Sequence, residues 1–157
     1  MSGENVFASM ESFFMALADK TRLRLLNLMR DEEVCVCFFT EVLSESQPKI
    51  SRHLAYLRNA GIVQARREGK WMHYSITPAK DTNEQRVLDA IFEWFDSREE
   101  MRRDREMYSE ACCSPEMLVQ IARTPMTFMV RNEEPEAAAE NGHFEEKRHN
   151  ELEEFLL

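Results

Sequence analysis

The chain has 157 residues, which is enough for one ordinary hydrophobic core and crowded for two. Apolar residues make up 43% of it and charged residues 31%, and no uninterrupted apolar run approaches the roughly 20 residues that span a bilayer. The N-terminus lacks a basic region followed by a long apolar segment, so no secretory signal is predicted. We therefore expect a soluble, cytoplasmic protein without a membrane partner.

The net charge of -9 is distributed unevenly along the chain. Between residues 46 and 80 the lysine and arginine residues are opposed only by Glu68, whereas glutamate dominates from residue 133 onward. Neutralisation of phosphates supplies most non-specific affinity for DNA. The middle of the chain is therefore suited to nucleic acid even though the whole chain is acidic.

Helices are predicted at both ends of this basic segment. Apolar residues recur at helical spacing over residues 6–17 and again over residues 21–30, in an element that begins at Asp19. A long helix is predicted from residue 87 to about residue 107, first apolar along one face and then increasingly charged. A short helix is predicted after Ser114.

A helix-turn-helix is predicted whose second helix lies at the start of this basic segment. A helix over residues 34–43 is followed by a short turn and by a second helix that Ser46 caps, with Pro48 in its first turn. Gly61 follows the second helix, as is typical of a helix-terminating glycine.

A β-hairpin is predicted directly after Gly61. Residues 62–67 and 71–76 are β-prone, and Glu68-Gly69-Lys70 joins them. The expected fold is therefore mainly α with a small β-hairpin (α+β), a winged helix-turn-helix.

The order of these elements resembles the ArsR/SmtB family of winged-helix metal-sensing repressors, from about residue 7 to residue 95. The strings that carry the resemblance are ADKTRLRLL (18–26), EVCVC (33–37), SQPKISRHL (46–54), LRNAGIV (57–63) and RREGK (66–70). The resemblance implies a transcriptional repressor of operator double-stranded DNA that is not an enzyme.

The predicted recognition helix carries short polar and basic side chains in its early turns, which suit base edges and phosphates. A solvated basic face is the alternative, but a basic hairpin directly after a helix-turn-helix favours DNA binding. The residues expected to contact DNA are Gln47, Lys49, Ser51, Arg52, His53, Tyr56 and Arg58 on the helix and Arg66, Arg67 and Lys70 in the wing.

A C2-symmetric homodimer is also expected, because the first helix and the long helix have faces too apolar to stay exposed. The residues predicted at the dimer interface are Phe13, Phe14, Leu88, Ile91, Phe92 and Phe95.

The four cysteines form two close pairs, Cys35 with Cys37 and Cys112 with Cys113. Reduced thiols are expected in a cytoplasmic chain, and soft thiolates select thiophilic ions. The resemblance implies that the Cys-x-Cys pair binds an inducer, trivalent arsenic (arsenite or a methylated trivalent arsenical) or antimonite, with no permanently bound cofactor. Thr40 stands where such repressors often have a third cysteine. Either pair, or both together, remain candidates for the metal site.

The local sequence also predicts the behaviour of the thiols. On an ideal helix Cys35 and Cys37 would point about 200° apart, so that one ion could bind both only if the helix deformed. The acidic residues 31–33 are expected to raise the pKa of Cys35. A helix beginning near Ser114 is expected to lower the pKa of Cys112 and Cys113.

Two alternatives remain for the function. One is a thiol redox-sensing repressor, in which either pair is oxidised. The other, from a different class, is an arsenic-carrying metallochaperone. The expected organisation is a DNA-binding and dimerisation domain (1–107), a cysteine-containing extension (108–130) and a mobile acidic tail (131–157).

Overall fold

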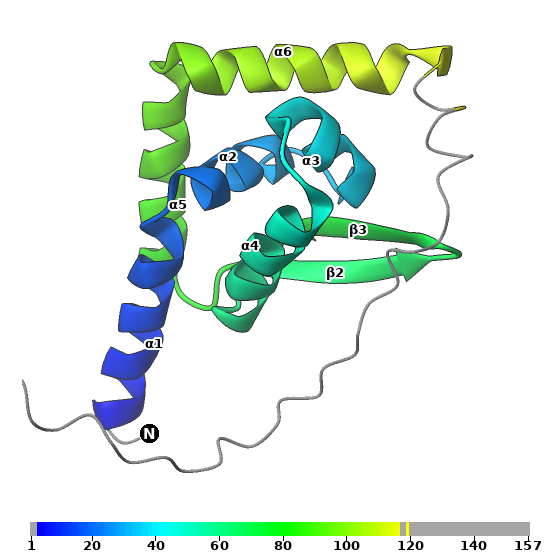
Figure 1. Ribbon diagram of the computed structural model, residues 1–157. Helices are drawn as coiled ribbons and strands as arrows, with labels where there is room; N and C mark the ends of the chain where they lie inside the picture. Colours follow the sequence, from blue (N-terminus) through cyan, green and yellow to red (C-terminus); the bar gives the residue numbers. More distant parts are fainter. Residues whose placement is uncertain (1–2, 117–118, 120–157) are drawn as a thin grey trace, which may run out of the picture. The chain divides into compact units, whose positions relative to one another are not determined.

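The computed structural model describes residues 3–116 and 119, with side chains from residue 8 on, all within one compact unit, Met1–Thr127. Its elements are α1 (Gly3–Leu17), α2 (Lys20–Met29), β1 (Val34–Cys35), α3 (Val36–Leu43), α4 (Gln47–Asn59), β2 (Val63–Glu68), β3 (Trp71–Ile76), α5 (Thr82–Asp96) and α6 (Glu99–Cys113) (Figure 1). The expected helical fold with a small β-hairpin is confirmed. The predicted tail (131–157) and most of the predicted helix after Ser114 lie outside the described residues.

The helix-turn-helix follows its local signals. Asp19 precedes α2, and its carboxylate accepts a hydrogen bond from the backbone N–H of Arg22 at 2.9 Å. Ser46 is the N-cap residue of α4, and Pro48 lies in the first turn. Gly61 follows α4 with a φ of +76°, a conformation that costs glycine little.

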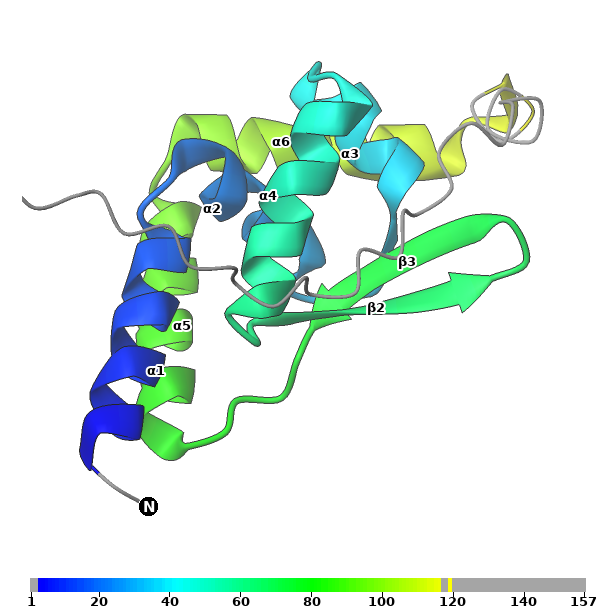
Figure 2. The same cartoon turned by 60° about the horizontal axis from the view of Figure 1, so that its bottom comes forward.

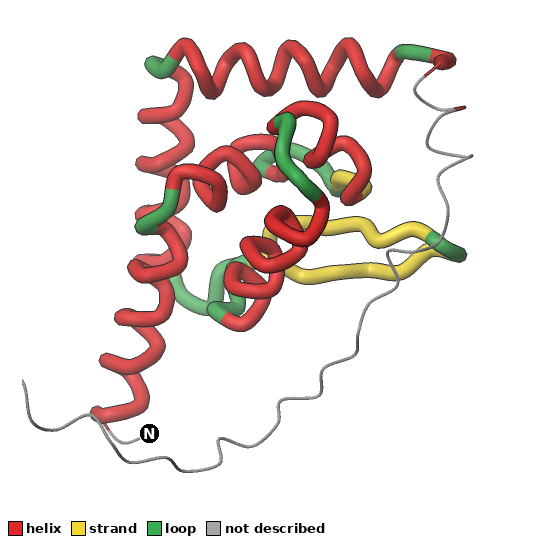
Figure 3. The backbone as a smooth tube through the Cα atoms, viewed as in Figure 1, coloured by secondary structure: helices red, strands yellow, loops and turns green. Residues whose placement is uncertain are grey.

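The wing is a three-stranded antiparallel sheet in the order β1-β3-β2. The β2–β3 hairpin confirms the predicted wing, and Gly69 turns it with a φ of +58°. The prediction that residues 34 and 35 are helical is wrong, because Val34 and Cys35 pair with Tyr74 and His73 of β3. Pairing with β3 gives the backbone groups of Val34 and Cys35 hydrogen-bond partners. In the first turn of a helix their N–H groups would have no partner within the helix. The helix α3 therefore begins at Val36 (Figure 3).

The predicted long helix is also wrong, because it is divided into α5 and α6, which run in different directions (Figures 1 and 2). The Ser97 hydroxyl donates to the carbonyl of Trp94 and closes α5. Arg30 of the α2 C-terminus donates to the carbonyl of Phe92 at 3.2 Å and to Asp96 at 2.6 Å. These contacts hold the last turn of α5 while α6 continues across α2 and α3.

The hydrophobic core lies between the helix-turn-helix and the helices around it. Its fully buried side chains include Leu25, Leu26, Val34, Phe39, Ile50, Leu54 and Leu57. No helix among the described residues is long and apolar enough to cross a membrane.

One buried ion pair joins α6 to this core. Both oxygens of Asp104 accept hydrogen bonds from the guanidinium of Arg24, each at 2.6 Å, and Asp104 is 2% exposed. Bidentate geometry makes this the strongest type of side-chain pair. A carboxylate in such a position is stable only while its partner is present.

Replacing Asp104→Ala should lower the free energy of unfolding by about 3 kcal/mol, because Arg24 would keep a largely buried charge without its bidentate partner and with only Glu100, 3.8 Å away, beside it. Urea denaturation measures the loss. The double variant Arg24→Met/Asp104→Leu should recover most of it, and Glu106→Gln on the exposed side of α6 should change little. A small loss in Asp104→Ala would contradict this role.

Candidate DNA interface and thiol site

Four of the predicted DNA contacts lie on the exposed face of α4. These exposed residues are Ser51, Arg52, Tyr56 and Arg58, and Tyr56 is 42% exposed. The opposite face of α4 is anchored in the core by three fully buried residues, Ile50, Leu54 and Leu57. This packing holds the exposed face of α4 towards the solvent.

The other three residues of α4 that were predicted to contact DNA are half-buried. Lys49 forms an ion pair with Glu45 at 2.6 Å, and His53 Nδ1 lies 3.4 Å from a carboxylate oxygen of Asp19. The side-chain oxygen of Gln47 is buried and accepts no hydrogen bond from the described residues.

Sequence reasoning missed one basic residue beside the exposed face of α4. The guanidinium of Arg22 in α2 lies 4.3 Å from the centre of the Tyr56 ring, and its Nε donates to the carbonyl of Ala16 at 2.7 Å. Arg22 therefore orients Tyr56 from a neighbouring helix. No pattern local to α4 could have indicated this contact.

The three basic residues of the wing are all exposed. Arg66 contacts Glu33 at 2.9 Å and Glu68 at 2.8 Å, and these pairs raise its pKa, the hydrogen bond to Glu33 first. Arg67 donates to the carbonyl of Gly69, and the Lys70 ammonium lies 4.7 Å from the centre of the Trp71 ring.

The first cysteine pair is already in contact. Cys37 donates a hydrogen bond from its thiol to Cys35 Sγ, with 2.9 Å between the sulfur atoms. The prediction of opposed thiols is wrong, because Cys35 has extended backbone (φ -68°, ψ 139°) as the N-cap of α3 and only Cys37 is helical. Thr40, where a third cysteine would stand, donates its hydroxyl to the carbonyl of Cys37.

The contact sets the acidities of the pair. The hydrogen bond from Cys37 lowers the pKa of Cys35 to about 7, against the effect of burial and with help from the backbone N–H groups of Val36 and Cys37. The same bond raises the pKa of Cys37. The expectation that the pKa of Cys35 is raised is wrong, because the hydrogen bonds that its sulfur accepts stabilise the thiolate.

The second pair has another environment. Cys112 is half-buried and Cys113 exposed, and they are the last two residues of α6. The described residues 115 and 116 are again helical, as the sequence predicts after Ser114. Burial raises the pKa of Cys112, with further contributions from the charges of Glu32 and Cys113, and a hydrogen bond with Tyr108 opposes them. For Cys112 the predicted lowering of the pKa is wrong, because burial of the thiol disfavours the thiolate.

The sheet connects the thiol site to the wing. Cys35 is the register partner of His73, whose other register partner is Arg66, so these three residues form one row across the three strands. Directly paired residues in a sheet point to the same face. Among the described residues no group of three or more His, Cys, Asp or Glu side chains is placed to hold a metal ion.

Comparison with known proteins gives a consistent answer. The profile described as "Bacterial regulatory protein, arsR family" matches residues 19–65, from the cap of α2 into β2. The chain is 49% identical over 86 residues to the arsenic resistance transcriptional regulator ArsR1 of Pseudomonas putida, and 44% identical over 77 residues to the arsenical resistance operon repressor of Escherichia coli. These matches cover 52% and 48% of this chain, and about two thirds of the relatives (67% and 66%).

A solved structure supports the fold. HlyU from Vibrio cholerae superposes with a TM-score of 0.52 and 26% identity, over 61% of this chain and 99% of HlyU. The segment matched by the family profile contains α2, α3, α4 and the first cysteine pair, and it ends before β3, α5, α6 and the second cysteine pair.

The acidity of Cys35 can be tested directly. In a Cys112→Ser/Cys113→Ser background, we expect the ultraviolet absorbance of a thiolate to appear with a midpoint near the pKa of about 7. Cys37→Ala should move the midpoint up towards the ordinary value of about 8.5, because the donor is lost. Cys37→Ser keeps a donor and should stay near the original midpoint. Equal midpoints for the alanine and serine variants would contradict the role of the Cys37 hydrogen bond.

Proposed function

Because the chain belongs to the ArsR family of bacterial regulatory proteins, we propose that it is a homodimeric repressor that leaves its operator when Cys35 and Cys37 bind trivalent arsenic. Proteins of this family are DNA-binding transcription regulators and not enzymes. The relatives from P. putida and E. coli are named for arsenic and arsenical resistance. The observation that carries the proposal is the row Cys35, His73 and Arg66, because it joins a thiol site to a basic wing.

The DNA-binding surface consists of the exposed face of α4 and the wing. Ser51 and Arg52 stand in the first half of α4, where a recognition helix meets base edges. Arg58 and the wing residues Arg66 and Arg67 supply cations for phosphates. The pairs of Arg66 with acidic neighbours are exposed and therefore weak, so its guanidinium can exchange them for phosphate contacts.

The homodimer is proposed from the apolar surface of α1 and α5, which lie side by side (Figures 1 and 2). Met10, Phe14 and Met15 are about half exposed (48%, 50% and 52%), and Trp94 is 60% exposed. The interface predicted from sequence needs correction, because its members Phe13, Leu88 and Phe95 are buried within the protomer. The dimer would instead bury Phe14 and Trp94 with their exposed methionine neighbours.

The thiol pair suits an arsenic atom with two exchangeable groups. Each thiol forms an As–S bond while its proton leaves with an arsenic-bound hydroxyl as water, so that two thiols release two waters. Methylarsonous acid has two hydroxyls and would be fully ligated by Cys35 and Cys37, whereas arsenous acid would keep its third. Because Thr40 offers no third sulfur, we propose that this site favours mono-substituted arsenicals.

The proposed coupling between arsenic binding and DNA binding rests on the two sulfur atoms belonging to different elements. Cys35 ends β1 and Cys37 lies in the first turn of α3, so an arsenic atom bonded to both would replace the thiol hydrogen bond at the junction of the two elements. β1 pairs with the wing strand β3, and α3 packs against α4. By linkage, bound DNA would weaken arsenic binding by the same factor by which arsenic weakens DNA binding.

The same contact favours a second candidate, a thiol redox sensor. The Cys35 thiolate would attack a peroxide oxygen and form a sulfenic acid as the second peroxide oxygen leaves in water. The Cys37 thiol would then attack the sulfenic sulfur and release water, giving a disulfide. The 2.9 Å between the sulfur atoms makes this step geometrically accessible.

The recognition helix is tested with Arg52→Ala. Loss of an arginine that reads a base edge should weaken operator binding by about 1–3 kcal/mol at matched salt. Arg86→Ala, an exposed arginine of α5, is the matched control and should bind like the wild type. Fluorescence anisotropy of a labelled promoter duplex measures the affinity, and sedimentation confirms that each variant keeps its oligomeric state. Equal affinities of the two variants would refute the role of Arg52.

The inducer is tested on the same complex under reducing conditions. A methylated trivalent arsenical should lower operator affinity about 5- to 150-fold. Cys35→Ser/Cys37→Ser should stay bound, whereas the matched control Cys112→Ser/Cys113→Ser should release DNA like the wild type. The reverse pattern would assign the inducer site to the second pair. Release by peroxide but not by the arsenical would replace arsenic sensing by the redox function.

A further inference from the structure

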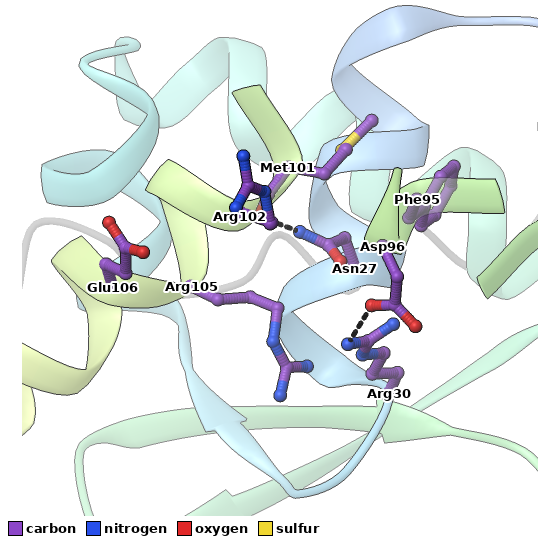
Figure 4. A pocket seen from close by; sticks show the side chains of 8 residues that line it. All are labelled: Asn27, Arg30, Phe95, Asp96, Met101, Arg102, Arg105 and Glu106. Carbon is purple, nitrogen blue, oxygen red and sulfur yellow. Dashed lines mark hydrogen bonds and ion pairs between the residues drawn. The ribbon is translucent and has the colours of Figure 1, made fainter. Parts of the chain in front are cut away.

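A cavity of about 190 Å³ lies among residues of α2, α5 and α6, away from the thiol pairs (Figure 4). Asn27 and Arg30 reach it from α2 and its end, Asp96 from the end of α5, and Arg102 and Arg105 from α6. One water needs only about 10–15 Å³, whereas a drug-sized ligand needs roughly 300 Å³ or more. The cavity is therefore large enough for a small polyatomic ion and too small for a drug-sized ligand.

Asn27 supplies an unpartnered acceptor at this cavity. The residue is fully buried, and its Nδ2 donates to the carbonyl of Met101 at 2.8 Å, which fixes the orientation of the amide. Its Oδ1 accepts no hydrogen bond from the described residues. A buried acceptor left unsatisfied costs about 1–3 kcal/mol, so a ligand with a hydroxyl group would gain by donating to it.

Guanidinium groups surround the same space. Arg30 donates to Asp96 and to the carbonyl of Phe92, and Arg105 contacts Asp31 through one terminal nitrogen at 2.6 Å. A guanidinium has five N–H groups, so these contacts do not use its full capacity. The pKa of Asp96 is lowered, first by the hydrogen bond from Arg30 and then by the charges of Arg30 and Arg105. Three guanidinium groups, of Arg30, Arg102 and Arg105, and two carboxylates, of Asp96 and Glu106, line the cavity. An anion there would use the N–H groups that the ion pairs of Arg30 and Arg105 leave open.

We propose that this cavity binds a small protonated oxyanion of the hydrogen phosphate type. Its hydroxyl would donate to Asn27 Oδ1, and its other oxygens would accept hydrogen bonds from Arg30 and Arg105. A fully deprotonated tetrahedral anion such as sulfate has no hydrogen to donate and would face the buried oxygen with another acceptor. Hydrogen arsenate has the same groups as hydrogen phosphate and belongs to the same ligand class.

An ion at this position would connect the two helices that meet there. Asn27 holds the first turn of α6 through Met101, and Arg30 holds the last turn of α5 through Asp96. Both residues come from α2, so the ion would fix the corner between α5 and α6 relative to α2. Its expected effect is a rise in thermal stability with ligand concentration.

The test is isothermal titration of the full chain with phosphate, arsenate and sulfate at equal ionic strength. We expect one phosphate site per chain and sulfate binding at least about tenfold weaker, because sulfate leaves the buried Asn27 oxygen unsatisfied. A higher affinity for arsenate or for phosphate identifies which oxyanion the site prefers. Equal binding of phosphate and sulfate, or no binding of phosphate, would overturn the proposal.

Variants of α6 locate the site. Arg105→Gln should reduce phosphate binding strongly, whereas Arg103→Gln, an exposed arginine of the same helix outside the cavity, should not. Asp31→Asn removes the carboxylate that competes for Arg105 and should leave phosphate binding intact or tighter. Equal effects of the Arg105 and Arg103 variants would contradict the assignment. The experiment contains no DNA, so its outcome is independent of the function proposed above.

Discussion

The buried pair of Arg24 and Asp104 is the interaction on which the arrangement of the C-terminal helices depends. Its two hydrogen bonds of 2.6 Å hold the middle of α6 across α2. With α6 in this position, Tyr108 packs edge-on against Phe38 of α3 at 5.5 Å between ring centres, and Met101 meets Asn27. The corner at Ser97 follows, since α5 must end where α6 can turn onto α2.

The chemistry of Cys35 and Cys37 depends on their position at the boundary between β1 and α3. A strand residue and a helix residue two positions apart can bring their side chains together, whereas two helical residues at that spacing cannot. Because Cys37 donates a hydrogen bond to the sulfur of Cys35, Cys35 is the more acidic thiol of the pair. A ligand that bonds to both sulfurs therefore acts on β1 and α3 at once.

The acidic residues before β1 connect the same region to its surroundings. Asp31 forms an ion pair with Arg105 of α6 at 2.6 Å, and Glu33 pairs with Arg66 of the wing. Both pairs are exposed and contribute little stability individually. The loop before β1 therefore contacts α6 through Asp31 and the wing through Glu33, in two separate ion pairs.

The sequence by itself determined the elements whose signals are local. Asp19 marked the start of α2, and Pro48 and Gly61 marked the two ends of α4. β-prone residues and a turn glycine predicted the hairpin, and helical spacing predicted the exposed face of α4 with Arg52. Only the tertiary structure decided the pairing of Cys35 with His73, the division between α5 and α6 and the cavity at Asn27. Each of these depends on groups far apart in the chain, and no periodicity within one segment encodes which distant backbone or charge will satisfy it.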